Sequence, residues 1–384
     1  MGAFGKIDFN LGDGGLGATP TSDDSISGLI VPYGTTAPTS NSGLRDSQNS
    51  ITLVTSFDDA VNNSWVQGSD FSDSILWTIK SFYSFAPSGT LLYIMGIRVA
   101  NGGTAPTFAT LFPPTAATNP TGTVDADLLI ELSNNNIRQL GVFYGEGTGS
   151  TLGVINLKSV SSTVLLPGNV DKAPAIINVW AERYAGLNPV NVILNAGMPN
   201  DDTSIQLDKF ISDSNFQTAN NRYVSMLLGV SQGSNNIINS GLIDDGDSGE
   251  WIDNSLGNLL GKISATPVQE NIAWVDAGAL RDFSYTTMSD NREVQSNFNY
   301  TQADITSLAN TNPKLVDKGF IGYRKYAGLT GTYFTNGLTL ASSTSDYQPL
   351  ANVRVINKVT RLLREVYLPF IHGDVQLDLS LIHI

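Results

Sequence analysis

The chain has 384 residues, a net charge of −14 and no cysteine. The lack of cysteine excludes disulfides, thiolate catalysis and cysteine-based zinc or iron–sulfur sites. The acidic balance argues against a nucleic-acid footprint over the whole chain, although residues 301–384 alone carry a net charge of +2. Only 15% of the residues are charged and 41% are hydrophobic, which predicts a folded chain whose surface is largely covered by neighbours.

No segment is predicted to enter a membrane. The most apolar run, TLLYIMGIRVA, is short and is interrupted by Arg98. The first eleven residues carry Lys6 and Asp8 and lack the apolar region of a signal peptide. We therefore expect no direct membrane insertion.

Near the N-terminus, Ile7, Phe9 and Leu11 alternate with polar residues, as in a strand with one apolar face. The glycines of GDGGLG and then Pro20 indicate a flexible joint after this strand. GDGGLG also matches a dinucleotide-binding pattern by letter, but the helix that the pattern requires does not follow, so no cofactor is predicted. A lone strand needs a sheet edge, which its own subunit or a neighbour could supply. We expect residues 1–28 to form an extended arm.

Residues 29–300 predict an α/β core, as one domain or two subdomains. Helical periodicity alternates with apolar runs that suit buried strands, and this alternation favours a mixed central sheet flanked by helices. The segments that carry the pattern are DSILWTIKSFYSF, TLLYIMGIRV, DADLLIELSNNNIRQLGVFYG, APAIINVWAERYAG, VNVILNA and RYVSMLLGV.

The tetrapeptide GDSG around Ser248 is the sequence that surrounds the nucleophile of chymotrypsin-like proteases. Such a serine needs a histidine base, and the two histidines, His372 and His383, both follow it near the C-terminus, against the chymotrypsin order. Asp247 with Glu250 indicates a helix cap instead. The acids around them do not fit the register of a calcium loop. We therefore expect neither an enzyme nor a metal site.

The most structured stretch precedes the C-terminus. Asn336-Gly337 lies between two alternating runs and predicts a hairpin. Ser345 with Gln348 predicts a capping box for a long helix that Pro369 ends. One apolar stripe is expected along this helix, formed by Leu350, Val353, Ile356, Val359, Leu363 and Val366. Arg354, Lys358 and Arg361 mark a basic face, either solvated or docked on an acidic partner.

The residues GFIGYRKYAGLTGTYFTNGLTLASSTSDYQPLANVRVINKVTRLLREVYLPF resemble the C-terminal part of contractile tail sheath proteins, from bacteriophages and related contractile injection systems. WTIKSFYSFAPSGTLLYIMGI and LGNLLGKISATPVQENIAWVDAGAL resemble the core of these proteins. FNLGDGGLGATPTSDDSISGLI resembles the N-terminal arm of sheath-like proteins from Bacteroidetes elements. The four segments follow in the family's order and span most of the chain.

Two features depart from the family. Sheath proteins usually continue well past the long helix, so we expect residues 301–378 to be a truncated inner sheath domain with a hairpin and the long helix. Residues 379–384, LSLIHI, resemble the translated end of a sequencing adapter, and we expect this tail not to belong to the natural protein.

The resemblance implies a structural subunit that polymerises around an inner tube and contracts to drive it through a target envelope, without catalysis. The implied partners are further copies of the chain, the inner tail tube protein, the baseplate and the tail terminator. Ile7, Phe9 and Leu11 would pair between subunits, and Arg354, Lys358 and Arg361 would face an acidic tube. The implied location is a virion tail, or the cytoplasm of the producing bacterium before release. The alternatives are an extracellular Gly/Ser/Thr-rich binding module or adhesin, and an α/β enzyme.

Overall fold

The computed structural model describes thirteen stretches of the chain. They are residues 23–33, 45–46, 49–63, 72–98, 108–115, 125–142, 173–195, 220–227, 256–280, 299–300, 319–324, 328–331 and 333–372.

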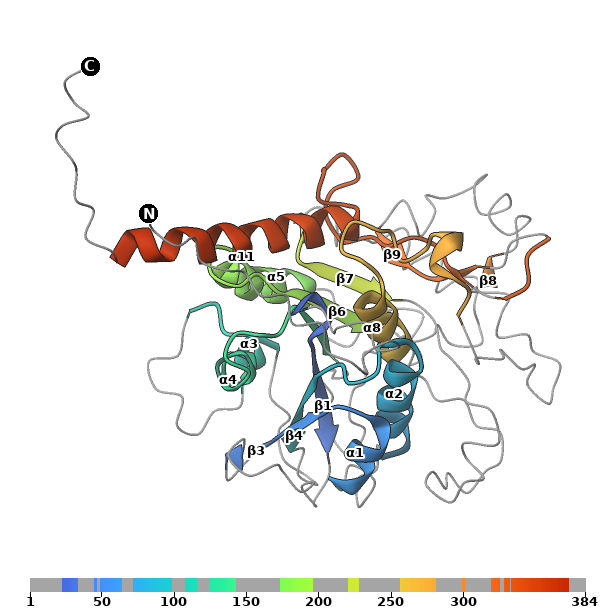
Figure 1. Cartoon of the computed structure of the whole chain (residues 1–384), viewed down its shortest axis with the longest axis horizontal. Helices are drawn as coiled ribbons and strands as arrows, with labels where there is room; N and C mark the ends of the chain where they lie inside the picture. The colour runs from blue at the N-terminus through green and yellow to red at the C-terminus, as the bar shows by residue number, and fades with distance from the viewer. Residues whose placement is uncertain are drawn as a thin grey trace, which may run out of the picture.

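An eight-stranded mixed sheet organises these residues, in the order β2-β3-β4-β1-β5-β6-β7-β9 (Figure 1). The strands from β4 to β9 run parallel, and β3 and β2 extend the sheet antiparallel at one edge. Their bounds are β1 Ser27–Tyr33, β2 Arg45–Asp46, β3 Asn49–Val54, β4 Leu92–Arg98, β5 Gln139–Val142, β6 Asn191–Asn195, β7 Val224–Leu227 and β9 Phe320–Ile321. The predicted α/β class with a mixed central sheet is confirmed.

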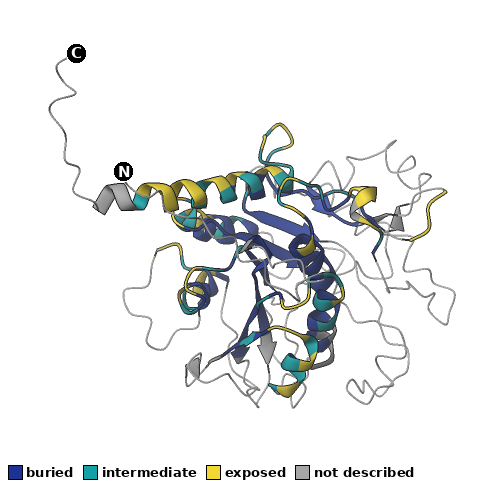
Figure 2. Ribbon diagram, in the orientation of Figure 1, coloured by how far each residue is buried: buried dark blue, intermediate teal, exposed yellow. Residues whose placement is uncertain are grey.

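Helices cover both faces of the sheet because the central strand β1 is apolar on both sides. Ile30 packs into one buried cluster, with helices α3, α4 and α5, whereas Leu29 and Val31 pack into the other, with α1, α2 and α8. These helices are α1 Phe57–Asn62, α2 Ser72–Phe85, α3 Phe108–Leu111, α4 Ala126–Leu132, α5 Ala173–Tyr184 and α8 Leu256–Ala265. The dark blue interior of Figure 2 follows this sandwich. The result is a three-layer arrangement, as the alternating sequence pattern predicts.

Helices α2 and α8 approach each other unusually closely. A Cβ atom built on Gly257 would lie 2.0 Å from the carbonyl oxygen of Thr78, and one on Gly261 would lie 2.4 Å from that of Phe82. The two glycines are four residues apart and therefore share one face of α8. The backbone of α2 therefore occupies the space that side chains at positions 257 and 261 would need.

The last part of the predicted arm, residues 23–28, belongs to this core. The short 3₁₀ helix η1 (Asp23–Ser25) leads directly into β1, and Asp24 and Ser27 are both buried. The arm can therefore include at most the residues before 23. Ile7, Phe9 and Leu11 lie outside the described residues, so their pairing stays a prediction.

The hairpin predicted at Asn336-Gly337 is wrong. The strand before it, β11 (Tyr333–Phe334), pairs with β10 (Tyr323–Arg324), which also pairs with β8 (Asn299–Tyr300) in a small second sheet. The residues after it form bridges elsewhere, Leu338 with Pro349 and Leu340 with Asn221. The side chain of Asn271 accepts a hydrogen bond from the Gly337 amide at 3.1 Å. Tertiary contacts thus override the local turn signal.

The long helix α11 runs from Leu350 to His372, and both of its predicted boundaries need correction. Ser345 does not cap the helix, because its hydroxyl accepts a hydrogen bond from the amide of Tyr347 within a preceding turn. The helix also continues past Pro369. The fixed φ of proline is compatible with a helix, so the helix continues through this residue. Because Pro369 has no backbone N–H, the hydrogen bond to the Glu365 carbonyl oxygen is lost.

Candidate functional site

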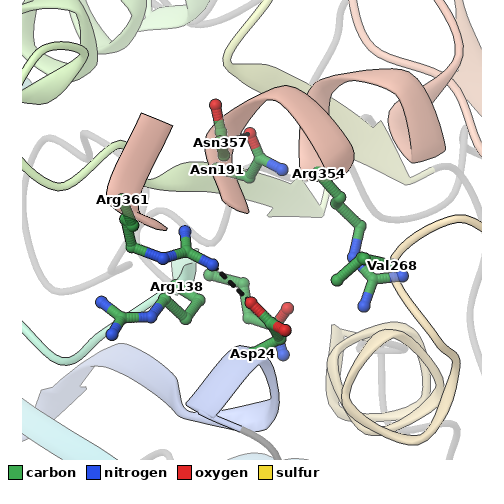
Figure 3. A pocket seen from close by; sticks show the side chains of 8 residues that line it. Asp24, Arg138, Asn191, Val268, Arg354, Asn357 and Arg361 are labelled. Carbon is green, nitrogen blue, oxygen red and sulfur yellow. Dashed lines mark hydrogen bonds and ion pairs between the residues drawn. The ribbon is translucent and has the colours of Figure 1, made fainter. Parts of the chain in front are cut away.

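A cluster of charged and polar side chains lies where α11 crosses the amino ends of the parallel strands. Asp24 precedes β1, Arg138 precedes β5, and Asn191 begins β6, while Arg354, Asn357 and Arg361 come from α11 (Figure 3). The cavity between them encloses about 10 Å³. This is room for roughly one water molecule and excludes a substrate.

Asp24 is the acidic centre of the cluster. Its carboxylate accepts a 2.5 Å ion pair from the Nζ atom of Lys358 and a second ion pair from the Arg361 guanidinium. The side chains of Asp24 and Arg361 are each 11% exposed, whereas that of Lys358 is 40% exposed. The buried Asp24–Arg361 pair is therefore the part of this contact that solvent screens least. Through it, α11 is fixed to the segment that enters the central strand.

Arg354 is not ion-paired with Asp24 but caps the C-terminal end of α8. Its guanidinium donates hydrogen bonds to the carbonyl oxygens of Ile263 at 3.0 Å, Thr266 at 2.8 Å and Pro267 at 3.3 Å. The last carbonyls of a helix have no partner within the helix, and a cation there also complements the helix dipole. Burial lowers the pKa of Arg354 to about 10, so the group still carries its charge at neutral pH.

Neutral side chains complete the junction between the sheet and its covering helices. Asn357 donates to Asn191 Oδ1 at 3.2 Å, which joins α11 to β6. Next to it, Gln139 donates to the hydroxyls of Ser27 at 2.8 Å and Ser264 at 2.6 Å, and these two hydroxyls lie 3.0 Å apart. The buried hydrogen bonds link β1, β5 and α8. The whole cluster holds elements of the fold together.

The three predicted tube-facing residues are brought together, but they face their own subunit. Arg354 is 6% exposed and is fully engaged with the end of α8, so it cannot meet a second protein while α11 is docked. Lys358 and Arg361 hold Asp24. The acidic partner expected from the basic face is thus, within the described residues, Asp24 of the same chain. Nothing in the sequence singled out Asp24, because its partners lie more than 330 residues away.

The predicted apolar stripe of α11 divides between two faces. Leu350 and Val353 are buried against the core, but Ile356, Val359, Leu363 and Val366 are 41–60% exposed. Helix residues that are three positions apart are separated by a rotation about 60° short of a full turn. A stripe built mostly from such steps winds around the helix, so that Val366 lies about 160° from Leu350. Figure 2 shows the change from a buried to an exposed helix along α11.

The chemical motifs considered in the sequence add no site within the described residues. Ser248 and the acids around it lie outside the described residues. Within the described part of the chain, no group of three or more histidine, aspartate or glutamate side chains is placed to hold a metal ion. The described helices also include none long and apolar enough to cross a membrane.

We expect the replacement of Arg354 by methionine to lower the free energy of unfolding by about 2 kcal/mol, because three carbonyl groups lose a charged donor. Hydrogen exchange should quicken mainly at the C-terminal end of α8. The matched control is Arg364→Met on the same helix, where the side chain is exposed, and it should change stability by no more than about 0.5 kcal/mol. Equal effects of the two substitutions would contradict the capping role.

Comparison with known proteins gives a matching family model and several solved structures of similar fold. The family described as "DUF2586, N-terminal domain" matches residues 159–338. No curated protein matches the chain. A chain of the cryo-EM structure of the anti-feeding prophage (AFP) baseplate, 6-fold symmetrised, aligns with a TM-score of 0.50 at 11% identity over 97% of this chain and 78% of that chain. The PVC sheath complex of an extracellular contractile injection system, in the contracted state, aligns with a TM-score of 0.47 at 9% identity over 97% and 76%.

The likeness to the AFP chain is a likeness of fold and extends over nearly the whole polypeptide. The predicted resemblance to proteins of contractile systems is therefore confirmed at the level of the fold: this chain has a fold found in contractile injection systems.

Proposed function

We propose that the chain is a structural subunit of a contractile tail sheath, which polymerises around an inner tube and contracts to drive the tube through a target envelope. The observation that carries the proposal is the fold shared with an AFP baseplate chain over 97% of this polypeptide. The sequence segments that resemble sheath proteins, and the absence of a substrate-sized cavity at the described cluster, support it.

The working part of such a subunit is an arm that adds a strand to a neighbour's sheet. The described residues supply a firm base for that arm. Its root at Asp24 is buried, is held by two cations of α11, and continues into the central strand of the sheet. A pull on the arm would therefore act on a buried strand in the middle of the sheet and on α11 together. No nucleotide is needed, because the driving free energy would lie in the difference between two lattice packings.

The proposed partners are further copies of the chain, the inner tail tube protein, the baseplate and the tail terminator. The tube contact is not assigned to Arg354, Lys358 and Arg361, since all three act inside the subunit. We place the protein in a phage tail or a related injector, made in the bacterial cytoplasm before release. We propose no catalytic activity, and no observation favours the adhesin.

The arm can be tested by substitution along one face of its predicted strand. Replacing Ile7, Phe9 and Leu11 by serine should abolish polymers that sediment at high speed, because the strand loses its apolar face. Replacing Asp8 and Asn10 by serine is the matched control and should leave the polymers intact. Polymers that persist after the first set of changes would contradict strand exchange between subunits.

A further inference from the structure

The small cavity beneath α11, called the α11 cavity below, is lined by more positive than negative side chains. The charged residues that line it are three arginines and one aspartate, namely Arg138, Arg354, Arg361 and Asp24. In the view of Figure 3, Arg354 and Arg361 lie on opposite sides of this space, with Asn191 and Asn357 between them. A confined space with this charge balance favours an anion, because the surrounding protein screens charges less than water does.

Arg354 is a buried cation whose hydrogen-bond partners are all neutral. The residue is 6% exposed, and its guanidinium binds three backbone carbonyl oxygens at the end of α8. The carboxylate of Asp24 is bound by Lys358 and Arg361 instead. Burial of a charge without a direct counter-charge is costly. An anion in the α11 cavity, beside Arg354, would offset this cost.

Two residues that line the α11 cavity also retain hydrogen-bond donors. A guanidinium has five N–H groups, and the three hydrogen bonds of Arg354 leave two of them without a partner in the described part of the chain. Asn191 is 4% exposed and accepts a hydrogen bond through its Oδ1 atom, which leaves its Nδ2 group in the same situation. Buried donors nearly always have an acceptor. A water molecule could accept these bonds, but it would leave the charge balance unchanged.

We propose that the α11 cavity binds a chloride ion, which accepts hydrogen bonds from Arg354 and Asn191 and lies against the Arg361 guanidinium. The cavity of about 10 Å³ suits a monatomic ion, because chloride is only slightly larger than water, whereas sulfate and phosphate are too large. The ion joins α11 to the amino end of β6 and helps to keep the helix docked. This role concerns the single subunit and does not depend on the proposed function.

Exchange of chloride for gluconate at constant ionic strength tests the site in the full-length chain. Gluconate is too large for the cavity but screens exposed charges equally. At a chloride concentration about ten times the dissociation constant, the equilibrium constant for urea unfolding should be about elevenfold lower than in gluconate. Hydrogen exchange between Arg354 and Arg361 should slow in parallel, because the ion holds this part of α11 against the sheet.

Two variants remove the site in different ways. Arg354→Met removes the buried cation, whereas Val268→Leu keeps every charge and places an additional carbon atom at the wall of the cavity. Both should lose the chloride dependence of unfolding. The matched control is Arg364→Met, which removes an exposed cation from the same helix and should retain the dependence. Val268→Leu decides the question if Arg354→Met does not fold.

Three results would overturn the chloride site. Equal stability of the parent chain in chloride and gluconate would assign the space to water. A chloride effect that persists in both Arg354→Met and Val268→Leu would place the ion elsewhere. The line width of the chloride NMR signal measures binding directly, and broadening that saturates only at molar chloride would indicate an adventitious ion only. Saturation well below this concentration, together with loss of the broadening in Val268→Leu, is the result we expect.

Discussion

Replacing Gly257 with alanine will lower the free energy of unfolding by about 2 kcal/mol. The added methyl group would lie 2.0 Å from the Thr78 carbonyl oxygen and 2.8 Å from its carbonyl carbon, so the two helices must separate. Forcing atoms into a packed interior costs typically about 1–3 kcal/mol and sometimes more. The better helix propensity of alanine offsets about 1 kcal/mol of this cost. The clash outweighs this gain because rigid backbone, and not a flexible side chain, stands in the way.

The matched control for Gly257→Ala is Gly186→Ala, since a Cβ atom there would meet nothing within 4 Å. Urea unfolding of both variants measures the difference. The control should match the parent chain within about 0.5 kcal/mol. If Gly257→Ala unfolds at the same urea concentration as the control, the close approach of α2 and α8 is wrong.

Replacing Asp24 with asparagine will lower the free energy of unfolding by about 3 kcal/mol, because the buried Arg361 loses its ion pair with the carboxylate. Most of this cost comes from Arg361, since Lys358 is 40% exposed and water can screen it. Hydrogen exchange should quicken in α11 around Lys358 and Arg361. The end of α8 should change less, because Arg354 keeps its three carbonyl partners.

Asp346→Asn is the control for the loss of one negative charge, because Asp346 is an exposed residue in the turn before α11. It should shift stability by less than about 0.5 kcal/mol. The Asp24 account fails if both variants unfold alike, or if Asp24→Asn leaves the exchange of α11 unchanged.

The sequence predicted the sheet and its helices well because their signals are local. Apolar runs such as VNVILNA mark buried strands, and the period of DSILWTIKSFYSF marks a helix, whatever the rest of the chain does. The Asn336-Gly337 turn failed for the opposite reason. Its flanking residues find better partners in Asn271 and Asn221, which the local sequence cannot reveal.

The cluster at α11 could be predicted only in part. Three cations on one face of the helix, Arg354, Lys358 and Arg361, stand out in the sequence, but periodicity does not say which face docks. The cations turn inward because Asp24 and the end of α8 supply their partners from distant segments. The glycine pair of α8 carried a usable signal, since two glycines four residues apart permit close helix contact.

Electron microscopy of the full-length chain tests most directly whether this protein works by assembling with copies of itself. We expect hollow tubes with regular cross-striations, formed without nucleotide or any other cofactor. Dispersed single subunits at every concentration, with residues 1–12 folded onto their own subunit, would contradict it.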